Sequence, residues 1–215
     1  MALGKTEIAQ VYDKRAKRYD LTAHLYYLLG FRLSAYRKMA VCALDLKPGD
    51  TVVEIGCGTG LNFPLLRAAV GPEGKIVGVD LSAEMLAGAG ELIKRNNWKN
   101  IELVHSDAAT YQFPEAVDGV ISTGAITYVP QYDQVIERGA KALAPGKRFV
   151  ILDFKKPAKW PLWLIKFFFF TMRPFGVTLD ITERHPWESI DRHLRSVQFK
   201  ELYFGGAYLC VGEAP

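Results

Sequence analysis

The chain has 215 residues, of which 49% are apolar and 23% are charged. This balance excludes an intrinsically disordered chain, and the length suits one well-buried domain but not two ordinary ones. The net charge is only +4, so any attraction to an anionic partner has to come from local clusters of basic residues, and nucleic acid is not expected as a partner.

The cysteine pattern and the N-terminus bear on the cellular compartment. Cys42, Cys57 and Cys210 lie far apart and form no CxxC pair, so neither a disulfide framework nor a zinc site is indicated, and no metal is expected. Residues 1–20 are charged throughout and lack the apolar run of a signal peptide. A cytoplasmic location is therefore expected.

The first predicted element is a helix over residues 6–20. Apolar side chains, among them Tyr12 and Tyr19, recur there at helical spacing, and basic residues occupy the remaining faces. Two roles are open for this helix. It is either a lid that closes over a ligand and brings Tyr19 to the site, or a helix that only packs on the domain. Aromatic and aliphatic residues over 21–43 predict further helix.

The central stretch of the sequence is Thr51–Gly60, TVVEIGCGTG. An apolar run broken only by Glu54 predicts a buried parallel strand, and Gly56, Gly58 and Gly60 predict a tight turn into a helix over 61–70. Glycine lets the backbone turn sharply and approach a ligand closely, because it has no Cβ. The stretch therefore predicts a site for a nucleotide-type cofactor.

The spacing of these glycines narrows the type of cofactor. The pattern fails the GxGxxG fingerprint of dinucleotide sites. An acid, Asp80, lies 20 residues beyond Gly60, at the end of the next apolar run, where it suits ribose hydroxyl groups. These features predict a cofactor that has a ribose and no diphosphate.

Strands and helices alternate through the rest of the chain, which predicts a parallel sheet with ligands at the carboxyl ends of its strands. Two segments around Gly205 and Gly206 predict an antiparallel hairpin added at the sheet edge. The predicted strands cover residues 75–80, 101–105, 117–122, 147–154, 197–204 and 207–212, and the predicted helices follow Ser82 as N-cap, span 131–144 and begin near His185.

A second informative stretch is Trp160–Phe170, WPLWLIKFFFF. Its 11 residues are too few to span a bilayer, which takes about 20. From Lys155 to Arg173 there are five basic residues and no acidic one. Two compatible interpretations remain: a segment that lies in a membrane interface, or a core helix that roofs the substrate pocket.

Three ordered motifs resemble those of class I S-adenosylmethionine-dependent methyltransferases: VVEIGCGTG, then GVDLS at Gly78–Ser82, then LAPGKRFVILDF at Leu143–Phe154. The resemblance covers about residues 10–212. Within that superfamily the two Tyr-Asp pairs, Tyr12-Asp13 and Tyr19-Asp20, resemble the opening of the ubiquinone and menaquinone C-methyltransferases and of small bacterial phospholipid N-methyltransferases.

The resemblance implies an α/β fold of the Rossmann-like class I methyltransferase type. A seven-stranded, mostly parallel sheet with an antiparallel C-terminal hairpin is then expected, with helices on both faces. The whole chain forms one methyltransferase domain. Its expected parts are an N-terminal helical lid at 1–46, a cofactor-binding core at 47–154, a helical insertion on the substrate side at 155–195 and the hairpin at 196–215.

S-adenosyl-L-methionine is the cofactor that the resemblance implies, and contacts follow by matching position. Glu54, Gly56 and Gly58 resemble the acid and glycines against which the methionine portion packs, and Gly60 opens the next helix. Asp80 resembles the ribose-binding acid. The other matched positions are Tyr19 on the lid, Leu81 and Met85 beside adenine, Asp107 and Ala108 at the adenine amine, and Ser122 and Thr123 where the methyl group is exposed.

The implied reaction is an in-line displacement at a sulfonium methyl, which depends on alignment and exclusion of water. A general base is needed only where the acceptor loses a proton, and Tyr128, His185 and Asp153 are the candidates. The first hypothesis for the acceptor is a lipid headgroup amine such as phosphatidylethanolamine, on an enzyme that is cytoplasmic or peripheral at an anionic membrane. A polyprenyl quinone methylated at carbon, a small soluble acceptor and a non-catalytic cofactor-binding protein are the alternatives.

Overall fold

The structure is a computed structural model, and it describes residues 32–158, 160, 161, 163–165, 167 and 183–215. The predicted lid helix over 6–20, with Tyr19, lies outside the described residues, and so does much of Trp160–Phe170. The described elements are α3 Leu33–Ala43, β1 Thr51–Ile55, α4 Phe63–Val70, β2 Lys75–Asp80, α5 Ala83–Arg95, β3 Ile101–His105, β4 Val117–Thr123, η2 Ile126–Tyr128, α6 Tyr132–Ala142, β5 Leu143–Phe154, α8 Pro186–His193, β6 Arg195–Leu202, η5 Tyr203–Gly205 and β7 Ala207–Glu213.

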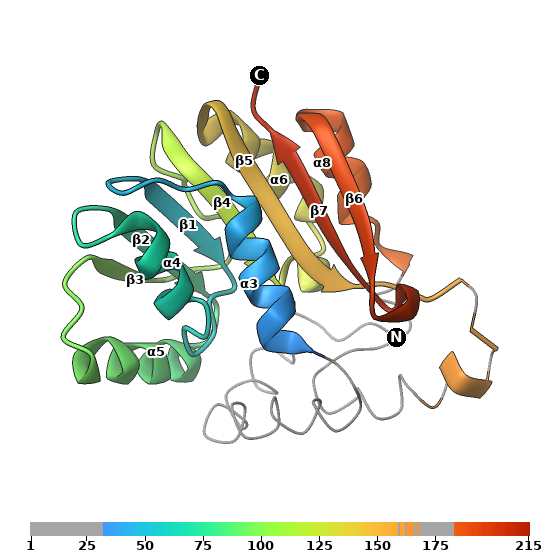
Figure 1. Ribbon diagram of the computed structural model, residues 1–215, viewed down its shortest axis with the longest axis horizontal. Coiled ribbons are helices and arrows are strands. Elements are labelled where there is room, and N and C mark those ends of the chain that lie inside the picture. Colours follow the sequence, from blue (N-terminus) through green and yellow to red (C-terminus); the bar gives the residue numbers. More distant parts are fainter. Residues whose placement is uncertain (1–31, 159, 162, 166, 168–182) are drawn as a thin grey trace.

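One seven-stranded sheet forms the centre of the molecule, with strand order β3-β2-β1-β4-β5-β7-β6 (Figure 1). The first five strands in this order pair in parallel, whereas β7 pairs antiparallel with both β5 and β6. The chain reverses its direction of travel across the sheet between β1 and β4. Ligands of open α/β sheets bind at such a switch point, at the carboxyl ends of the strands.

Two apolar layers cover the two faces of the sheet. On one face, α3, α4 and α5 pack through Val41, Phe63 and Leu86. On the other face, α6 and α8 pack through Ile136 and Ile190, and Figure 1 shows these two helices side by side. The predicted fold, a mostly parallel sheet with an antiparallel hairpin and helices on both faces, is confirmed.

The start of β5 differs from the sequence prediction. The helix was expected to run to Ala144 and the strand to begin at Lys147, but α6 ends at Ala142 and β5 begins at Leu143. Leu143 is buried and pairs with Val117, while the next paired residue is Arg148. The residues between them bulge out of the ladder, since Gly146 has φ of 75°.

The C-terminal hairpin also closes differently from the predicted glycine turn. The expected strand over 197–204 is β6, which ends at Leu202, and the turn is made by Tyr203–Gly205. Within the described residues, no helix combines the length and the apolar character that crossing a bilayer requires.

Candidate active site

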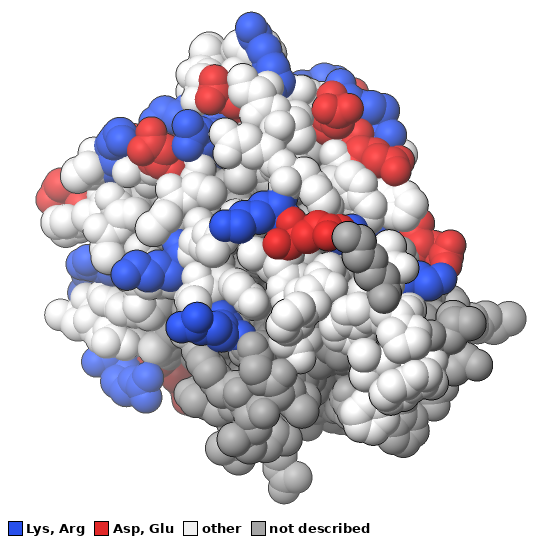
Figure 2. Space-filling view, turned by 45° about the vertical axis from the view of Figure 1, so that its right-hand side comes forward, with Lys and Arg blue, Asp and Glu red and all other residues white. Residues whose placement is uncertain are grey.

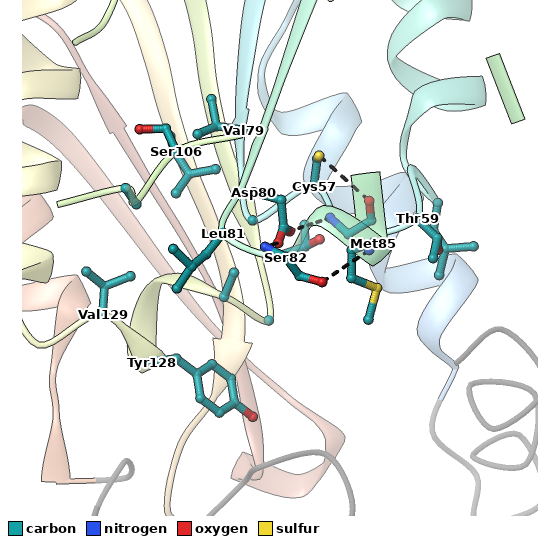
Figure 3. Close-up of a pocket in the computed structure, with 18 of the residues that line it drawn as sticks. Cys57, Thr59, Val79, Asp80, Leu81, Ser82, Met85, Ser106, Tyr128 and Val129 are labelled. Carbon is teal, nitrogen blue, oxygen red and sulfur yellow. Dashed lines mark hydrogen bonds between the residues drawn. The ribbon is translucent and has the colours of Figure 1, made fainter. Parts of the chain in front are cut away.

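A cavity opens at the carboxyl ends of β1, β2 and β4, and Figure 3 shows it in close-up. Its wall combines the glycine turn after β1, the start of α5, the loop after β3 and the turn after β4, segments that are far apart in the sequence. Of the residues predicted to hold the cofactor, those on this wall are Gly56, Gly58, Asp80, Leu81, Met85, Asp107, Ala108 and Thr123.

The remaining predicted residues lie elsewhere. Glu54 and Ser122 are buried behind the wall, with exposed fractions of 1% and 0%, and the Ser122 hydroxyl accepts a hydrogen bond from Ile126 N at 3.1 Å. Gly60 lies farther along the turn, where an added Cβ would meet the Phe63 ring at 2.4 Å. Gly60 therefore serves the packing of α4 and does not line the cavity.

The glycine turn depends on backbone conformations that favour glycine. Gly56 and Gly58 have φ values of 70° and 55°. A Cβ on Gly56 would lie 2.1 Å from Cβ of Ala125, so the β1 turn and the turn after β4 touch at this point. The Gly58 side faces unfilled space, with no atom within 4 Å of an added Cβ. The backbone at Gly56, packed against Ala125, therefore forms the floor of the cavity, and the backbone at Gly58 borders its open space.

Asp80 organises the end of β2. Its Oδ2 accepts a hydrogen bond from Gly58 N at 2.8 Å, and its Oδ1 accepts one from Ser82 N at 2.9 Å (Figure 3). Burial raises the pKa of this carboxyl, and the bonds from Ser82 and Gly58 partly oppose the shift. Ser82 also caps α5, since its Oγ accepts from Met85 N at 3.1 Å. The carboxylate thus stays at the cavity wall with lone pairs left for ribose hydroxyls.

We expect Asp80→Asn to weaken the binding of S-adenosylhomocysteine by about 1–3 kcal/mol, because a hydroxyl of the ligand would lose a charged acceptor. Isothermal titration calorimetry measures this change. The matched control is Asp118→Asn, since Asp118 accepts from Thr51 N at the opposite end of β1. Equal affinity in the wild type and Asp80→Asn would contradict the assignment of Asp80 to the ribose.

The loop after β3 is held by a residue that the sequence analysis missed. Asp107 Oδ1 accepts from Ala109 N at 2.9 Å and closes the turn. From α6, the Arg138 guanidinium donates to the carbonyl oxygens of Ala108 at 3.1 Å and Ala109 at 2.8 Å. Arg138 therefore fixes the backbone beside the position at which adenine is expected.

A buried polar network lies at the glycine-turn end of the cavity. Arg37 of α3 lines the cavity, and its Nη1 donates to Asn62 Oδ1 at 3.1 Å and to Thr123 Oγ1 at 2.9 Å. Asn62 Nδ2 donates in turn to Glu54 Oε1 at 2.6 Å and to Thr123 Oγ1 at 2.9 Å. Neither Arg37 nor Asn62 was predicted. Arg37 reaches the site from α3, whose local sequence carries no ligand signal, whereas Asn62 directly follows the glycine turn as the N-cap residue of α4.

Glu54 is the acid of this network. Burial raises its pKa to about 7, against the opposing effects of the Asn62 hydrogen bond and the Arg37 charge. Its Oε2 is buried and has no hydrogen-bond partner among the described residues. On the cavity wall itself, the Arg37 guanidinium at one end and the Asp80 carboxylate at the other fit a ligand that carries a carboxylate and a ribose, and Glu54 supports Arg37 from behind the wall through Asn62. The residues present therefore fit S-adenosylmethionine.

The three candidates for a general base occupy different places. Tyr128 lies on the cavity wall with 8% of its surface exposed, across from Met85 in Figure 3. His185 lines a second cavity, whose wall also includes Lys155, Trp160 and Trp187. Asp153 lines neither of these cavities. It is 3% exposed, and burial raises its pKa to about 6.

Asp153 and Arg184 hold the backbone at Thr127 from two sides. Asp153 Oδ2 accepts from Thr127 N at 3.2 Å, and Arg184 Nη1 donates to Thr127 O at 2.8 Å. Thr127 precedes Tyr128 of the first cavity, and Arg184 precedes His185 of the second. This clamp therefore links the chain segments that carry Tyr128 and His185, and Asp153 acts on Tyr128 only through Thr127.

Among the described residues, neither a reactive thiol nor a cluster of metal ligands is found. Cys57 lies on the cavity wall but is 5% exposed, and burial raises the pKa of its thiol well above the ordinary value. A thiol held in its neutral form is a poor nucleophile. Among the residues that the structure describes, no three His, Cys, Asp or Glu side chains come together as metal ligands would.

A family model for the methyltransferase domain matches residues 46–169, which is more than half of the chain. The chain belongs to the methyltransferase domain family. The match spans the glycine turn, Asp80, the loop after β3 and all of β5. The protein is thus an S-adenosylmethionine-dependent methyltransferase of class I, as its motifs predicted.

Relatives of this methyltransferase include the demethylmenaquinone methyltransferase of Bacillus cytotoxicus. The two are 27% identical over 229 residues, covering 97% of this chain and 95% of the relative. Among solved structures, an S-adenosylmethionine-dependent methyltransferase from Aquifex aeolicus is similar with a TM-score of 0.60 and 20% identity, over 83% of this chain and 89% of the other. Phosphoethanolamine N-methyltransferase 2 of Haemonchus contortus has a TM-score of 0.66 and 17% identity, over 83% and 52%. These structural likenesses concern the fold alone.

Proposed function

We propose that this methyltransferase transfers a methyl group to a ring carbon of a polyprenyl quinone in its reduced, hydroxylated form. The observation that carries the proposal is the similarity to demethylmenaquinone methyltransferases, which extends over 97% of this chain and 95% of the relative. That length includes the segment 155–195, where acceptor contacts are expected. A lipid headgroup amine, the first hypothesis from the sequence, becomes the second candidate.

The second cavity is the proposed acceptor site. Trp160 and Trp187 make its wall aromatic, which suits a planar acceptor, and Lys156 adds positive charge. The contact between Arg184 and Thr127 links it to the segment that carries Tyr128 of the cofactor cavity. A ring placed there lies beside the turn that carries Tyr128, at the carboxyl ends of β4 and β5.

Methylation at a ring carbon gains from ionising the neighbouring hydroxyl group, because the oxyanion raises the electron density on that carbon. His185 is the proposed base. Its Nδ1 lies 3.0 Å from Glu188 Oε1, and since a carboxylate only accepts, a neutral imidazole in this contact would carry its proton on Nδ1 and offer Nε2 as the acceptor. Stacking on Trp187, with ring centroids 4.6 Å apart, fixes the plane of the imidazole.

When bound, S-adenosylmethionine supplies an electrophilic methyl group on a sulfonium. The chain's own part is then positioning: Asp80 and the glycine turn orient the cofactor, and Tyr128 closes the wall between the cavities. Asp153 and Arg184 fix Thr127, and with it Tyr128. His185 takes the hydroxyl proton, and the ring proton leaves to solvent or base once the new carbon–carbon bond has formed.

A specific observation favours the amine candidate. The faces of Trp160 and Trp187 attract cations, and Lys155 Nζ already lies 5.8 Å from the Trp187 ring centroid. An ammonium headgroup would suit such a wall. Both acceptors are carried by lipids, so either candidate agrees with a peripheral position at a membrane.

The test incubates the purified protein with methyl-labelled S-adenosylmethionine and, in parallel, with chemically reduced demethylmenaquinone or with vesicles of phosphatidylethanolamine. Mass spectrometry of the extracted lipids then locates the label. Label on the quinone ring supports the first candidate. Label on the headgroup nitrogen replaces it with the second, and label on neither lipid rejects both.

His185→Gln should lower kcat by a factor of about 10²–10⁴, the usual contribution of a general base, with no change in affinity for S-adenosylhomocysteine. The reason is that His185 lies on the second cavity and away from the cofactor wall. His193→Gln on the same helix is the matched control, because His193 contacts Asp133 at 3.3 Å and not the cavity. A kcat of His185→Gln within twofold of the control would remove the base assignment.

A further inference from the structure

The turn between β6 and β7 holds two aromatic residues in a conformation that aromatic residues avoid. Tyr203 and Phe204 have φ values of 47° and 54°, and Gly205 follows at 88°. For residues with a Cβ, the left-handed region costs roughly 1–2 kcal/mol, and a bulky residue there is a genuine outlier. Gly, Asn or Asp is the ordinary choice for such a position.

Phe204 gains nothing from burial that would offset this strain. Its side chain is 86% exposed, the largest exposed fraction among the exposed large apolar side chains of the described residues. The hydrophobic effect stabilises a fold only when apolar surface leaves water. A strained backbone that presents a phenyl ring to solvent is therefore not explained by the stability of the hairpin, and strain of this kind points to function.

A half-buried Trp packs against this turn, and two exposed aromatic residues follow it in the sequence. Trp160 Nε1 donates to Phe204 O at 3.0 Å, and the Trp160 and Tyr203 rings meet edge to face with centroids 6.2 Å apart. Beyond Trp160 along the chain, Trp163 is 69% exposed and Phe167 is 60% exposed. We call Phe204, Trp163 and Phe167 the aromatic rim. Figure 1 places both of its segments at the lower right of the molecule.

The stretch of sequence that contains Trp163 and Phe167 is basic. From Lys155 to Arg173 the sequence has five basic residues and no acidic one. Lys155 is neutralised by Glu201, whereas Lys156 beside it is exposed. In Figure 2, which turns this side of the molecule forward, the described surface at the lower right is white between grey residues, while blue and red side chains mix higher up.

We propose that the aromatic rim is a membrane-insertion surface, and that the Tyr203–Gly205 turn is built to drive Phe204 into the headgroup layer of an anionic bilayer. Exposed Trp and Phe beside basic residues are the composition of interfacial anchors. The turn adds Phe204, from the far end of the chain, to Trp163 and Phe167, and the Phe204 carbonyl group contacts Trp160, which lines the proposed acceptor cavity. The surface is independent of which acceptor is methylated.

The test uses a substitution that separates membrane binding from folding. Phe204→Asn keeps a residue that tolerates the left-handed region and removes the ring. We expect its affinity for vesicles of phosphatidylglycerol and phosphatidylcholine to fall at least fivefold. We also expect its melting temperature to equal or exceed that of the wild type, because strain is relieved and no buried contact is lost. Phe204→Trp should retain vesicle binding.

Co-sedimentation measures the vesicle affinities and differential scanning fluorimetry the melting temperatures. Lys75→Gln is the matched control at the amino end of β2, away from the rim, and should bind like the wild type. Turnover of a water-soluble, short-chain acceptor by Phe204→Asn should stay at the wild-type level, which separates a failure of this proposal from a failure of the proposed function. Wild-type protein that ignores anionic vesicles at low salt, or Phe204→Asn that binds them like the wild type, would overturn the assignment.

Discussion

Replacing Glu54 with Gln should raise the free energy of unfolding of the cofactor-free protein at pH 8 by up to about 3 kcal/mol. Burial raises the pKa of Glu54 from the model-compound value of 4.5 to about 7 in the folded protein. Between these two pH values the folded state binds more protons than the unfolded state, so stability falls as the pH rises through this window. Gln keeps the acceptor for Asn62 and carries no charge to desolvate.

Urea unfolding at pH 5 and pH 8 measures this effect. The wild type should lose stability between the two pH values, and Glu54→Gln should lose much less. Glu73→Gln, at an exposed position, is the control and should follow the wild type. A stability difference that is the same at both pH values would show that Glu54 does not titrate in this range.

Gly56→Ala should destabilise the fold by about 2–4 kcal/mol, the sum of a left-handed residue with a Cβ and an overpacked contact. The added methyl would lie 2.1 Å from Cβ of Ala125, so the turns after β1 and β4 would have to separate. Because these turns form the cavity floor, cofactor binding should be lost as well.

Gly58→Ala is the matched comparison for Gly56→Ala. Its φ of 55° adds a similar strain, but the methyl would meet no atom within 4 Å. We expect a smaller loss of stability, of about 1 kcal/mol, together with weaker S-adenosylhomocysteine binding, because the methyl occupies space on the cavity wall. Equal melting temperatures for the two variants would show that contact with Ala125 does not limit position 56.

Most of the fold was predictable because local patterns and tertiary structure agree. The boundaries of β2 and β3 match the predicted strands, and Ser82 caps α5 as its position before an apolar stripe predicted. The prediction of β5 was wrong at its start because Pro145-Gly146 was taken as the end of a helix. Leu143 already belongs to the sheet, because it pairs with Val117 of β4.

The residues of the candidate site were predictable where they belong to a sequence motif. They were not predictable where a long side chain reaches the site from a distant part of the chain. The spacing of Asp80 and of the glycine turn in the sequence was enough to predict their positions at the site. Arg37, Arg138 and Arg184 act on the site from helices or loops 25 to 86 residues away from the groups they bind. Arginine is common on surfaces, so only the three-dimensional contact distinguishes these three. The strain at Phe204 likewise has no signature in the sequence.

The order of strands in the sheet also affects how this protein folds as it is synthesised. Val52 of β1 pairs with Gly119 of β4, 67 positions later, so the centre of the sheet closes only after a long loop has been brought together. Such non-local pairing slows folding. The described cavity wall runs from Arg37 to Val129, and a growing chain has no complete wall until Val129 has left the ribosome. The described wall is therefore complete while β5, β6 and β7 are still to be made, and cofactor cannot stabilise any intermediate that precedes β4.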